Sequence, residues 1–379
     1  MNTNSLRKMR ELEVENSEIS AEETQSTSDD DGDTCDEDEL SKIFKNCSPM
    51  AEKVVAPDKY ILHIAATLET NPNAALSLSD NTCEVYNLSN NQFAKLHVFA
   101  EHTDVISEIR FSSENSNLLY TGCADGRVRL WDLRTPRECS VEFKDTTVGI
   151  GKFEEITCFD VSPNNMLLAA GTNLFEGDAF MLFWDVRKHS LLGGYWESHT
   201  DDITQVKFHH DDPNKLISGS VDGLINLYDL SQNNEEDALI DSLNTESSVE
   251  KLRWLQHQGK DIVGCITHTA DVQLWRTDDA QPYCHLHRAE IAKATKRKSE
   301  EHIYVVDTYA TTNNLLVLAG SNYCDGESFR GLSVAGKTVE PTFRFLNNMQ
   351  RVRASWFNCH TDLLLSGGEK GIINAWKPS

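Results

Sequence analysis

Two sets of side chains combine a hydroxyl, an imidazole and a carboxylate, the three groups that many hydrolases use for acyl transfer. A catalytic triad needs a single exposed nucleophile beside an oxyanion hole. A set that recurs along the chain therefore indicates a structural role, and we predict no catalytic residue and no enzyme activity. The two sets are His102, Thr121, Asp125 and Trp131, and His199, Ser218, Asp222 and Tyr228.

A phosphate-loop pattern, G-x-x-x-x-G-K-[ST], occurs at residues 331–338. Such a loop binds nucleotides because a helix follows it and directs its first N–H groups toward the phosphates. Here residues 339–345 alternate in polarity and contain Pro341, which disfavours a helix. We expect residues 331–334 to form a strand, 335–337 a turn and 338–345 an outer strand. A nucleotide-binding enzyme is only a distant alternative.

Metal ligands are sparse in the sequence. None of the ten cysteines forms a C-x-x-C pair, and several lie in apolar, strand-like runs, so we interpret them as small buried hydrophobes. The segment Cys284–His287 is the only one that resembles a ligand cluster. No second cluster follows it at the spacing of a zinc finger. We expect no metal and no cofactor.

An internal repeat positions these residues. The segment Leu118–Asp132 recurs at Leu216–Asp229 and at Leu363–Trp376. Each copy is an apolar strand, a turn at Asp-Gly or Lys-Gly, and an alternating strand that ends near an aromatic residue, which is typical of a β-hairpin. Weaker copies fill the gaps, so that successive closing positions lie 42 to 59 residues apart. The closing positions are Tyr86, Trp131, Trp184, Tyr228, Trp275, Val334 and Trp376.

The repeat resembles the WD-repeat family, with literal Trp-Asp dipeptides at residues 131–132 and 184–185. The resemblance covers residues 42–379 and implies an all-β, seven-bladed WD-repeat β-propeller with four strands in each blade. The chain ends three residues after Trp376, which leaves the last blade without an outer strand. Family members commonly close the ring by pairing a strand from one terminus into the blade at the other. We therefore expect residues 43–47 to complete blade seven.

The same resemblance gives the two hydroxyl–imidazole–carboxylate sets a role. It implies an internal hydrogen-bond network in each blade that links the turn, the inner strands and the end of the third strand. Residues 197–209 and 234–239 look specific to one group within the family. Two further segments are candidate additions to the common scaffold, namely an insertion at 173–178 and a connection at 276–302 that we expect to be a solvated loop.

The W-D-x-R motif occurs in two consecutive repeats and ends at Arg134 and Arg187. In some relatives this motif resembles the docking signature for the adaptor of a cullin–RING ubiquitin ligase. The two arginines are expected side by side on one rim of the ring. The alternative interpretation is that they are ordinary polar turn residues.

The charge is concentrated at the N-terminus. The net charge is −25, and the segment Glu11–Glu39 holds fourteen acidic residues and no Lys or Arg. Such a composition buries too little apolar area to offset its conformational entropy, so we predict that residues 1–41 form a disordered acidic tail. A protein this acidic is not expected to bind nucleic acids directly, whereas a basic protein partner suits it.

Targeting signals are absent from the sequence as given. Residues 1–5 lack the apolar segment of a secretory signal, and no apolar run approaches the length of a membrane span. We expect a monomer in the cytoplasm, the nucleus or both. The predicted function is a non-catalytic protein-interaction scaffold, specifically a chaperone or assembly factor for a basic client such as a ribosomal protein or a histone. The alternative is a substrate receptor of a cullin–RING ubiquitin ligase.

Overall fold

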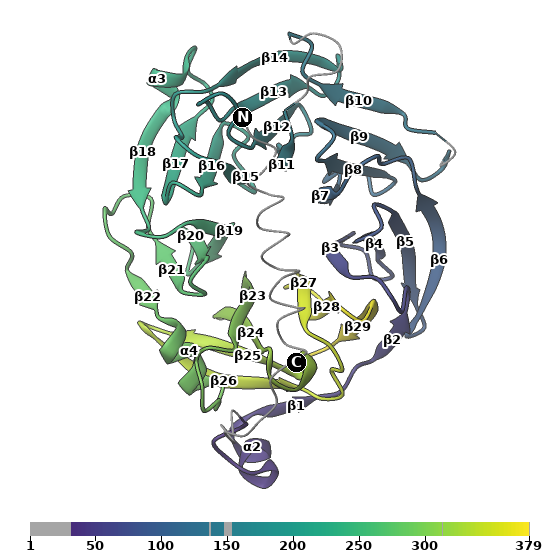
Figure 1. Cartoon of the computed structure of the whole chain (residues 1–379), viewed down its shortest axis with the longest axis vertical. Coiled ribbons are helices and arrows are strands. Elements are labelled where there is room, and N and C mark those ends of the chain that lie inside the picture. Colours follow the sequence, from purple (N-terminus) through teal and green to yellow (C-terminus); the bar gives the residue numbers. More distant parts are fainter. Residues whose placement is uncertain (1–31, 136–137, 148–153, 313, 379) are drawn as a thin grey trace, which may run out of the picture.

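The computed structural model describes residues 32–135, 138–147, 154–312 and 314–378. In these residues seven twisted sheets surround a central axis as the blades of a propeller (Figure 1). The first strand of each blade lies nearest the axis and contacts the first strands of the two neighbouring blades. The predicted all-β, seven-bladed β-propeller is confirmed.

Each blade has its strands in sequence order from the axis outward, apart from the two segments that close the ring. Blades one to four are β3 (Ile61–Ala66), β4 (Asn73–Leu78), β5 (Cys83–Ser89) and β6 (Gln92–Phe99); β7 (Ile106–Phe111), β8 (Leu118–Cys123), β9 (Arg127–Asp132) and β10 (Val141–Lys144); β11 (Ile156–Val161), β12 (Leu167–Thr172), β13 (Met181–Asp185) and β14 (Ser190–Tyr195); and β15 (Ile203–Phe208), β16 (Lys215–Ser220), β17 (Leu224–Asp229) and β18 (Leu239–Asn244).

The remaining blades follow the same order. They are β19 (Val249–His257), β20 (Lys260–Thr267), β21 (Val272–Trp275) and β22 (Cys284–Leu286); β23 (Ile303–Ala310), β24 (Leu315–Ser321), β25 (Ser328–Ala335), β26 (Thr338–Phe345) and the added β1 (Lys45–Cys47); and β27 (Val352–Asn358), β28 (Leu363–Gly368), β29 (Ile372–Trp376) and the added β2 (Ala51–Val54). The short helices are α2 (Glu37–Ile43), α3 (Glu235–Ala238), α4 (Arg288–Ala294) and the 3₁₀ turn η2 (Tyr323–Gly326).

The repeat signature forms the hairpins that it predicts. Gly126 and Gly223 adopt φ of 81° and 84° in the turns between the second and third strands, a region that favours glycine. The aromatic residue near the end of the third strand packs between neighbouring blades. Phe99 of blade one stacks on Trp131 of blade two, for example, with ring centroids 4.5 Å apart. The apolar core is therefore a series of clusters between the blades.

The ring closes through the N-terminal segment, but the predicted strand is wrong. Residues 43–47 do not complete blade seven. Instead, β1 pairs in parallel with β26 as a fifth strand of blade six, where Cys47 lies opposite Phe345. The next strand, β2, fills the open edge of blade seven, and Ala51 lies opposite Ala375. The reason is packing, because the apolar side chains beside β1 are buried against blade six.

The predicted disorder of residues 1–41 is wrong for its last part, because residues 32–41 are folded onto blade six. Their anchor is Asp33, whose carboxylate accepts hydrogen bonds from Arg297 Nη1 at 3.1 Å and Arg330 Nη2 at 2.7 Å. Both arginines are buried. A buried arginine needs a charged partner, and this acidic segment supplies one. Residues 1–31 of the predicted tail lie outside the described residues.

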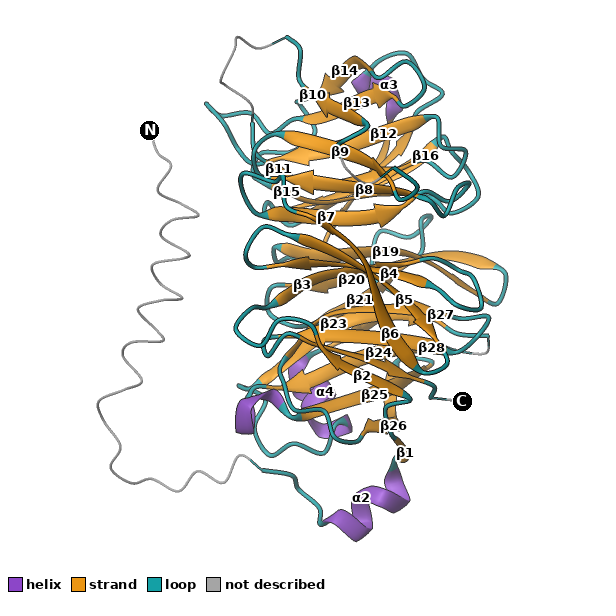
Figure 2. Ribbon diagram, turned by 90° about the vertical axis from the view of Figure 1, so that its right-hand side faces the viewer, coloured by secondary structure: helices purple, strands orange, loops and turns teal. Residues whose placement is uncertain are grey.

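Helix α2 continues this attachment and lies outside the ring beside β1, as the edge-on view shows (Figure 2). Its first residue, Glu37, accepts a hydrogen bond from Arg344 Nη2 at 2.8 Å. Leu40 and Phe44 are buried in the cluster between blades five and six. These two apolar residues and the arginine partners order a segment that composition alone would leave unfolded.

The phosphate-loop pattern at residues 331–338 is a β-hairpin, as the sequence predicts. Strand β25 pairs antiparallel with β26, and Gly336 adopts φ of 65° in the turn between them. In the described structure, residues 339–345 are strand and no helix follows the turn. The feature that makes such a loop a nucleotide site is therefore missing from this one.

The two predicted additions differ in structure. Residues 173–178 connect β12 to β13 and leave Leu174 exposed. The connection 276–302 is not the solvated loop that we expected, because it contains β22 and α4 and buries Arg297. Among the described residues, no helix has both the length and the apolar character to cross a bilayer.

Candidate interaction site

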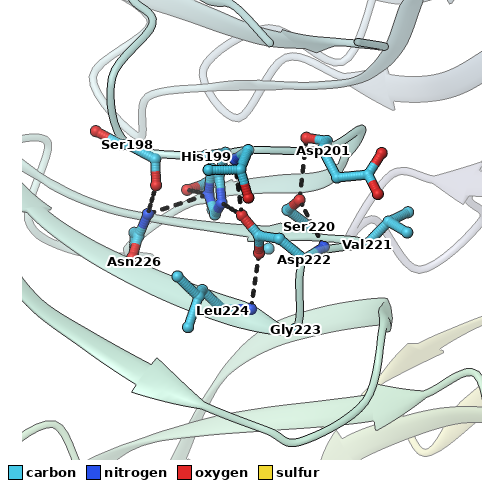
Figure 3. A network of polar contacts seen from close by, with 12 residues as sticks. Ser198, His199, Asp201, Ser220, Val221, Asp222, Gly223, Leu224 and Asn226 are labelled. Atoms are coloured by element: carbon cyan, nitrogen blue, oxygen red, sulfur yellow. Dashed lines mark hydrogen bonds and ion pairs between the residues drawn. The ribbon is translucent and has the colours of Figure 1, made fainter. Parts of the chain in front are cut away.

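The second hydroxyl–imidazole–carboxylate set forms a continuous network in blade four, and Figure 3 shows the part around His199 and Asp222. His199 lies before β15, Ser218 on β16 and Asp222 in the turn that follows. His199 Nδ1 is 3.0 Å from Asp222 Oδ2, and its Nε2 is 2.6 Å from Ser218 Oγ. Ser218 Oγ lies 3.3 Å from the Tyr228 hydroxyl. All four predicted residues of this set are brought together.

The carboxylate of Asp222 also holds the turn. Its oxygens accept the backbone N–H groups of Thr200 at 3.0 Å and Leu224 at 2.8 Å. Burial raises the pKa of Asp222, but the hydrogen bonds from His199 and from the two amides outweigh burial and lower that pKa below its usual value. Asp222 is therefore an ionised acceptor that joins the loop before β15 to the hairpin.

The first set, in blade two, is only partly connected. His102 Nε2 is 2.8 Å from Thr121 Oγ1, which also accepts the indole N–H of Trp131 at 2.9 Å. Asp125 makes no hydrogen bond to the imidazole. Its carboxylate instead accepts the Thr103 hydroxyl at 2.9 Å and Arg129 Nη2 at 2.6 Å. Among the described residues, His102 Nδ1 has no hydrogen-bond partner.

The surroundings of His102 also change the pKa of its imidazole. Burial, reinforced by the positive charge of Arg129, lowers the pKa of His102 to about 4. His102 is therefore a neutral buried side chain at physiological pH. The hydroxyls of Thr121 and Ser218 belong to fully buried residues, so no substrate can reach either one. Both sets can stabilise their blades, but neither has the exposed nucleophile of a hydrolase.

The two W-D-x-R arginines are exposed turn residues. Arg134 donates from Nη2 to Asp132 Oδ2 at 2.6 Å, and Arg187 Nε lies 3.8 Å from Asp185 Oδ1. Both follow the third strand of their blades, and blades two and three are neighbours. Each guanidinium is thus held by the aspartate of its own motif while most of its surface remains accessible.

The central channel contains charged side chains that sequence reasoning missed. Lys207 Nζ is 2.9 Å from Glu108 Oε2, and Arg253 Nε is 2.6 Å from Asp307 Oδ1. Each residue lies on the innermost strand of its blade. Arg253 and Asp307 belong to the neighbouring blades five and six, whereas Lys207 of blade four reaches Glu108 of blade two, beyond blade three. Within each pair the opposite charges cancel, so these side chains form a poor docking site for a charged partner.

A groove of about 660 Å³ lies on the outer side of blades three and four. Strand β14 forms one wall, and the segment around α3 forms the other. Two large apolar side chains, Leu192 and Trp196, are exposed there. Three glutamates line the groove, whereas its lining contains no lysine or arginine. An apolar surface with an acidic border suits a segment that carries both apolar and basic side chains.

One of these glutamates builds the groove. The carboxylate of Glu235 accepts the backbone N–H groups of Trp196 at 2.8 Å and Glu197 at 2.9 Å, and it also bonds to the Ser198 hydroxyl. Residues 197–209 and 234–239, the two segments that the sequence marks as specific to one group, therefore meet here. Sequence reasoning identified both segments but missed that they share a groove, because only the folded ring brings them together.

Comparisons with known proteins agree with this fold. The family described as nucleolar protein 10-like, N-terminal domain, a β-propeller, matches residues 66–259, just over half of the chain. The WD repeat-containing protein GTS1 of Arabidopsis thaliana is 30% identical over 257 residues, which are 65% of this chain and 61% of that protein. This similarity thus spans less than two thirds of that relative's length.

Two further relatives have the same character. The WD repeat-containing protein 89 homolog of Dictyostelium discoideum is 28% identical over 267 residues, 70% of this chain and 68% of that protein. An uncharacterized WD repeat-containing protein of Saccharomyces cerevisiae is 47% identical over 90 residues, 24% of this chain and 23% of that protein. The group that residues 197–209 and 234–239 indicate is that of WD repeat-containing protein 89.

Proposed function

This chain belongs to the nucleolar protein 10-like N-terminal domains, a family of WD-repeat β-propellers, and from this premise we propose that it is a scaffold that captures a basic protein segment. Propellers of this family bind protein partners on a rigid ring. The observation that carries the finer proposal is the groove between blades three and four, which pairs exposed apolar side chains with carboxylates. We place this capture in the cytoplasm or the nucleus, where basic clients such as ribosomal proteins and histones are assembled.

The groove offers two kinds of contact to such a segment. Leu192 and Trp196 supply apolar area, and an indole face also attracts a guanidinium or an ammonium group. Glu197 and Glu236 are exposed at its border and can accept charged hydrogen bonds. Glu235 is committed to the backbone of the groove itself, so it supports the shape of the site and does not contact the partner directly.

The negative charge of the protein adds a long-range attraction to these local contacts. The net charge of −25 attracts a basic client over about one Debye length, ~8–10 Å near physiological salt. Such attraction raises the association rate more than it slows dissociation. Because residues 32–41 fold onto blade six, a deletion that tests this effect should end at residue 31.

The proposal is tested by fluorescence anisotropy with two labelled peptides, one rich in Lys and Arg around a central Leu and one with Glu in place of the basic residues. We expect the basic peptide alone to bind, more tightly at low salt than at high salt. Trp196→Ala and Glu236→Lys should each weaken its binding several-fold. Deletion of residues 1–31 should slow its association at low salt and change its dissociation little.

Matched controls lie on blade one and the loop after it. Val98→Ala removes an exposed apolar side chain from β6, and Glu101→Gln removes an exposed carboxylate near blade two. Neither should change binding of the basic peptide. Equal binding of the acidic peptide contradicts the proposed charge preference. Unchanged binding in both groove variants places the partner elsewhere on the ring.

A ubiquitin-ligase substrate receptor is the second candidate, and one observation favours it. Arg134 and Arg187 are both exposed at the ends of third strands in neighbouring blades. If they dock the adaptor of a cullin–RING ligase, the Arg134→Ala/Arg187→Ala variant should lose co-purification of that adaptor. Retained co-purification in this variant rejects the docking role, as does its absence with the parent chain.

A further inference from the structure

A cluster of two imidazoles and one carboxylate lies on blade five, remote from the groove. His285 Nε2 and His287 Nδ1 are 3.1 Å and 3.2 Å from the same oxygen, Asp271 Oδ2. All three ligand atoms lie within 4.8 Å of one another. From this geometry we propose that Asp271, His285 and His287 form a binding site for a borderline divalent cation such as Zn²⁺.

Local structure explains why these three side chains meet. His285 and His287 are two residues apart at the end of β22, so they point to the same face of the sheet, while Cys284 and Leu286 point inward and are buried. Strand β21 runs antiparallel to β22, with Val272 opposite Leu286. This register places Asp271, which immediately precedes β21, opposite His287 and on the same face.

The carboxylate is oriented for a ligand. Its other oxygen, Asp271 Oδ1, accepts the backbone N–H of Arg288 at 2.8 Å, which leaves Oδ2 facing the two imidazoles. The backbone N–H of His287 is held by Glu290 Oε2 at 3.0 Å. Supporting contacts of this kind fix the direction of metal ligands. The two short distances are near the ~3.3 Å that separates ligand atoms around a tetrahedral Zn²⁺ with bonds of about 2.0–2.1 Å.

The ligand set also selects the class of metal. Two imidazoles and one carboxylate suit Zn²⁺ and its neighbours better than Mg²⁺ or Ca²⁺, which prefer oxygen ligands alone. His287 is more than half exposed, so water can complete the coordination. A bound cation would tie the three-residue strand β22 to the turn between β20 and β21. It would thus brace the outer edge of blade five where the connection to blade six begins.

A second cluster in the chain gives a built-in contrast. His209, His210 and Asp261 also bring three ligand atoms within 4.8 Å of one another. However, His209 Nδ1 accepts the backbone N–H groups of Asp211 and Asp212 at 3.2 Å and 3.1 Å. The neutral ring therefore keeps its proton on Nε2, the atom that faces Asp261 and that a metal would need to be unprotonated. In the Asp271 cluster the nitrogens that face the carboxylate also carry protons, but there each proton can move to the other nitrogen of its ring when a metal binds, because in the described structure no backbone N–H group donates to His285 Nδ1 or His287 Nε2. In the second cluster the backbone occupies that nitrogen of His209.

The test is competition for Zn²⁺ between the full chain and a chromophoric chelator, with Co²⁺ absorption as a second readout. We expect one Zn²⁺ per chain, a higher melting temperature with Zn²⁺, and a Co²⁺ spectrum without the thiolate charge-transfer bands of cysteine ligands. His287→Asn and His285→Asn should each weaken Zn²⁺ binding at least about tenfold, since even supporting residues of metal sites contribute 10–100-fold. Asp271→Asn, which can still accept the Arg288 amide, should do the same.

Matched controls separate this site from other ligands. His210→Asn and Cys324→Ser remove an exposed imidazole from the second cluster and an exposed thiol, and neither should change Zn²⁺ affinity. His287→Asn should keep the parent melting temperature without metal, because this side chain is more than half exposed and asparagine is a favourable residue at the N-cap of α4. Unchanged affinity in both His285→Asn and His287→Asn overturns the proposal, as does the lack of saturable binding at one equivalent. A loss of affinity in His210→Asn or Cys324→Ser alone assigns the metal elsewhere and also overturns it.

Discussion

Blades two and four carry equivalent four-residue sets that are hydrogen-bonded differently. In blade four, His199 bridges Asp222 and Ser218 in one continuous network. In blade two, His102 reaches only Thr121, while Asp125 binds Arg129 and the hydroxyl of Thr103. Both blades nevertheless have the same hairpin and the same turn glycine. The set of residues is thus compatible with the fold in more than one pattern of bonds.

One position decides the pattern. Blade two has Arg129 on β9 where blade four has Asn226 on β17, judged from the aligned repeats. Asn226 is neutral and donates to the Ser198 carbonyl oxygen at 2.7 Å, so it leaves Asp222 to the imidazole. Arg129 is buried with a positive charge and must recruit a carboxylate. A buried guanidinium thus takes a carboxylate acceptor in preference to a neutral imidazole.

The largest expected effect is that of Asp125→Ala, because this change leaves Arg129 buried without its main partner. Removing one member of a buried ion pair costs about 3–5 kcal/mol, and we expect the lower end because Glu142 remains 3.5 Å from Arg129 Nε. Asp222→Ala leaves the buried imidazole of His199 without this acceptor, which costs ~1–3 kcal/mol. The amides of Thr200 and Leu224 belong to exposed and half-buried residues, so water can replace the lost carboxylate there. Free energies of unfolding from urea titrations should rank the two variants in this order.

A second variant tests whether the unpaired charge of Arg129 causes this loss of stability. Asp125→Ala/Arg129→Leu removes both charges and should recover most of the lost stability. Equal losses in the single and double variants contradict the buried-charge argument. They would instead show that Asp125 acts mainly through the turn.

The next effect concerns pH. The pKa of His102 is lowered to about 4 in the folded protein, against about 6.5 in an unfolded chain. Between these two values the unfolded chain binds the additional proton, so stability should fall as pH decreases from about 6.5 to about 4. The full contribution is present above pH 6.5, and its loss amounts to about 3 kcal/mol at most.

His102→Gln is the variant that isolates this contribution, because glutamine keeps a hydrogen-bonding group but does not titrate in this range. Its stability should vary less with pH than that of the parent between pH 4 and 6.5. Urea titrations across this interval provide the measurement. Parallel pH profiles for the two proteins would show that other groups cause the acid sensitivity.

A smaller effect is expected from Arg129→Asn, which gives blade two the residue of blade four. Without the guanidinium, Asp125 is free to accept a hydrogen bond from His102 Nδ1, as Asp222 does from His199. One ion pair is exchanged for one hydrogen bond, so the net change in stability should stay within about 1–2 kcal/mol. The imidazole should then hold its proton to higher pH, which NMR titration of His102 detects. A pKa that stays near 4 contradicts the proposed competition.

The sequence predicted the number of blades correctly but not the strand that closes the ring. Seven closing positions, including Val334, defined seven blades because each one marks a third strand that packs between blades. The sequence favours residues 43–47 as the closing strand because that segment precedes the first repeat and has no partner of its own. Two short segments, β1 and β2, compete for that role, and the choice depends on which blade buries Phe44 and Cys47.

Contacts between segments far apart in the chain explain the features that the sequence does not predict. Residues 32–41 looked disordered because acidic residues dominate them, and the arginines that bind Asp33 come from blade six and the connection before it. The groove was missed for a related reason, since its walls come from different blades. The His-x-His segment was noticed, but its third member, Asp271, could be found only from the register of β21 and β22.

The smallest effect is expected at the end of β9, where Arg134 repeats the ion pair of Arg129 on the surface. The side chain of Arg134 is 63% exposed and that of Arg129 only 4%. The hydrogen bonds from Arg134 hold the pKa of Asp132 at about 2. Solvent screens such a pair, and the flexible side chain loses entropy when it is held in place. Arg134→Ala should therefore leave the melting temperature unchanged, alone or with Arg187→Ala. A marked drop would show that the turn depends on this pair, and it would also remove the exposed arginines as clean probes of adaptor docking.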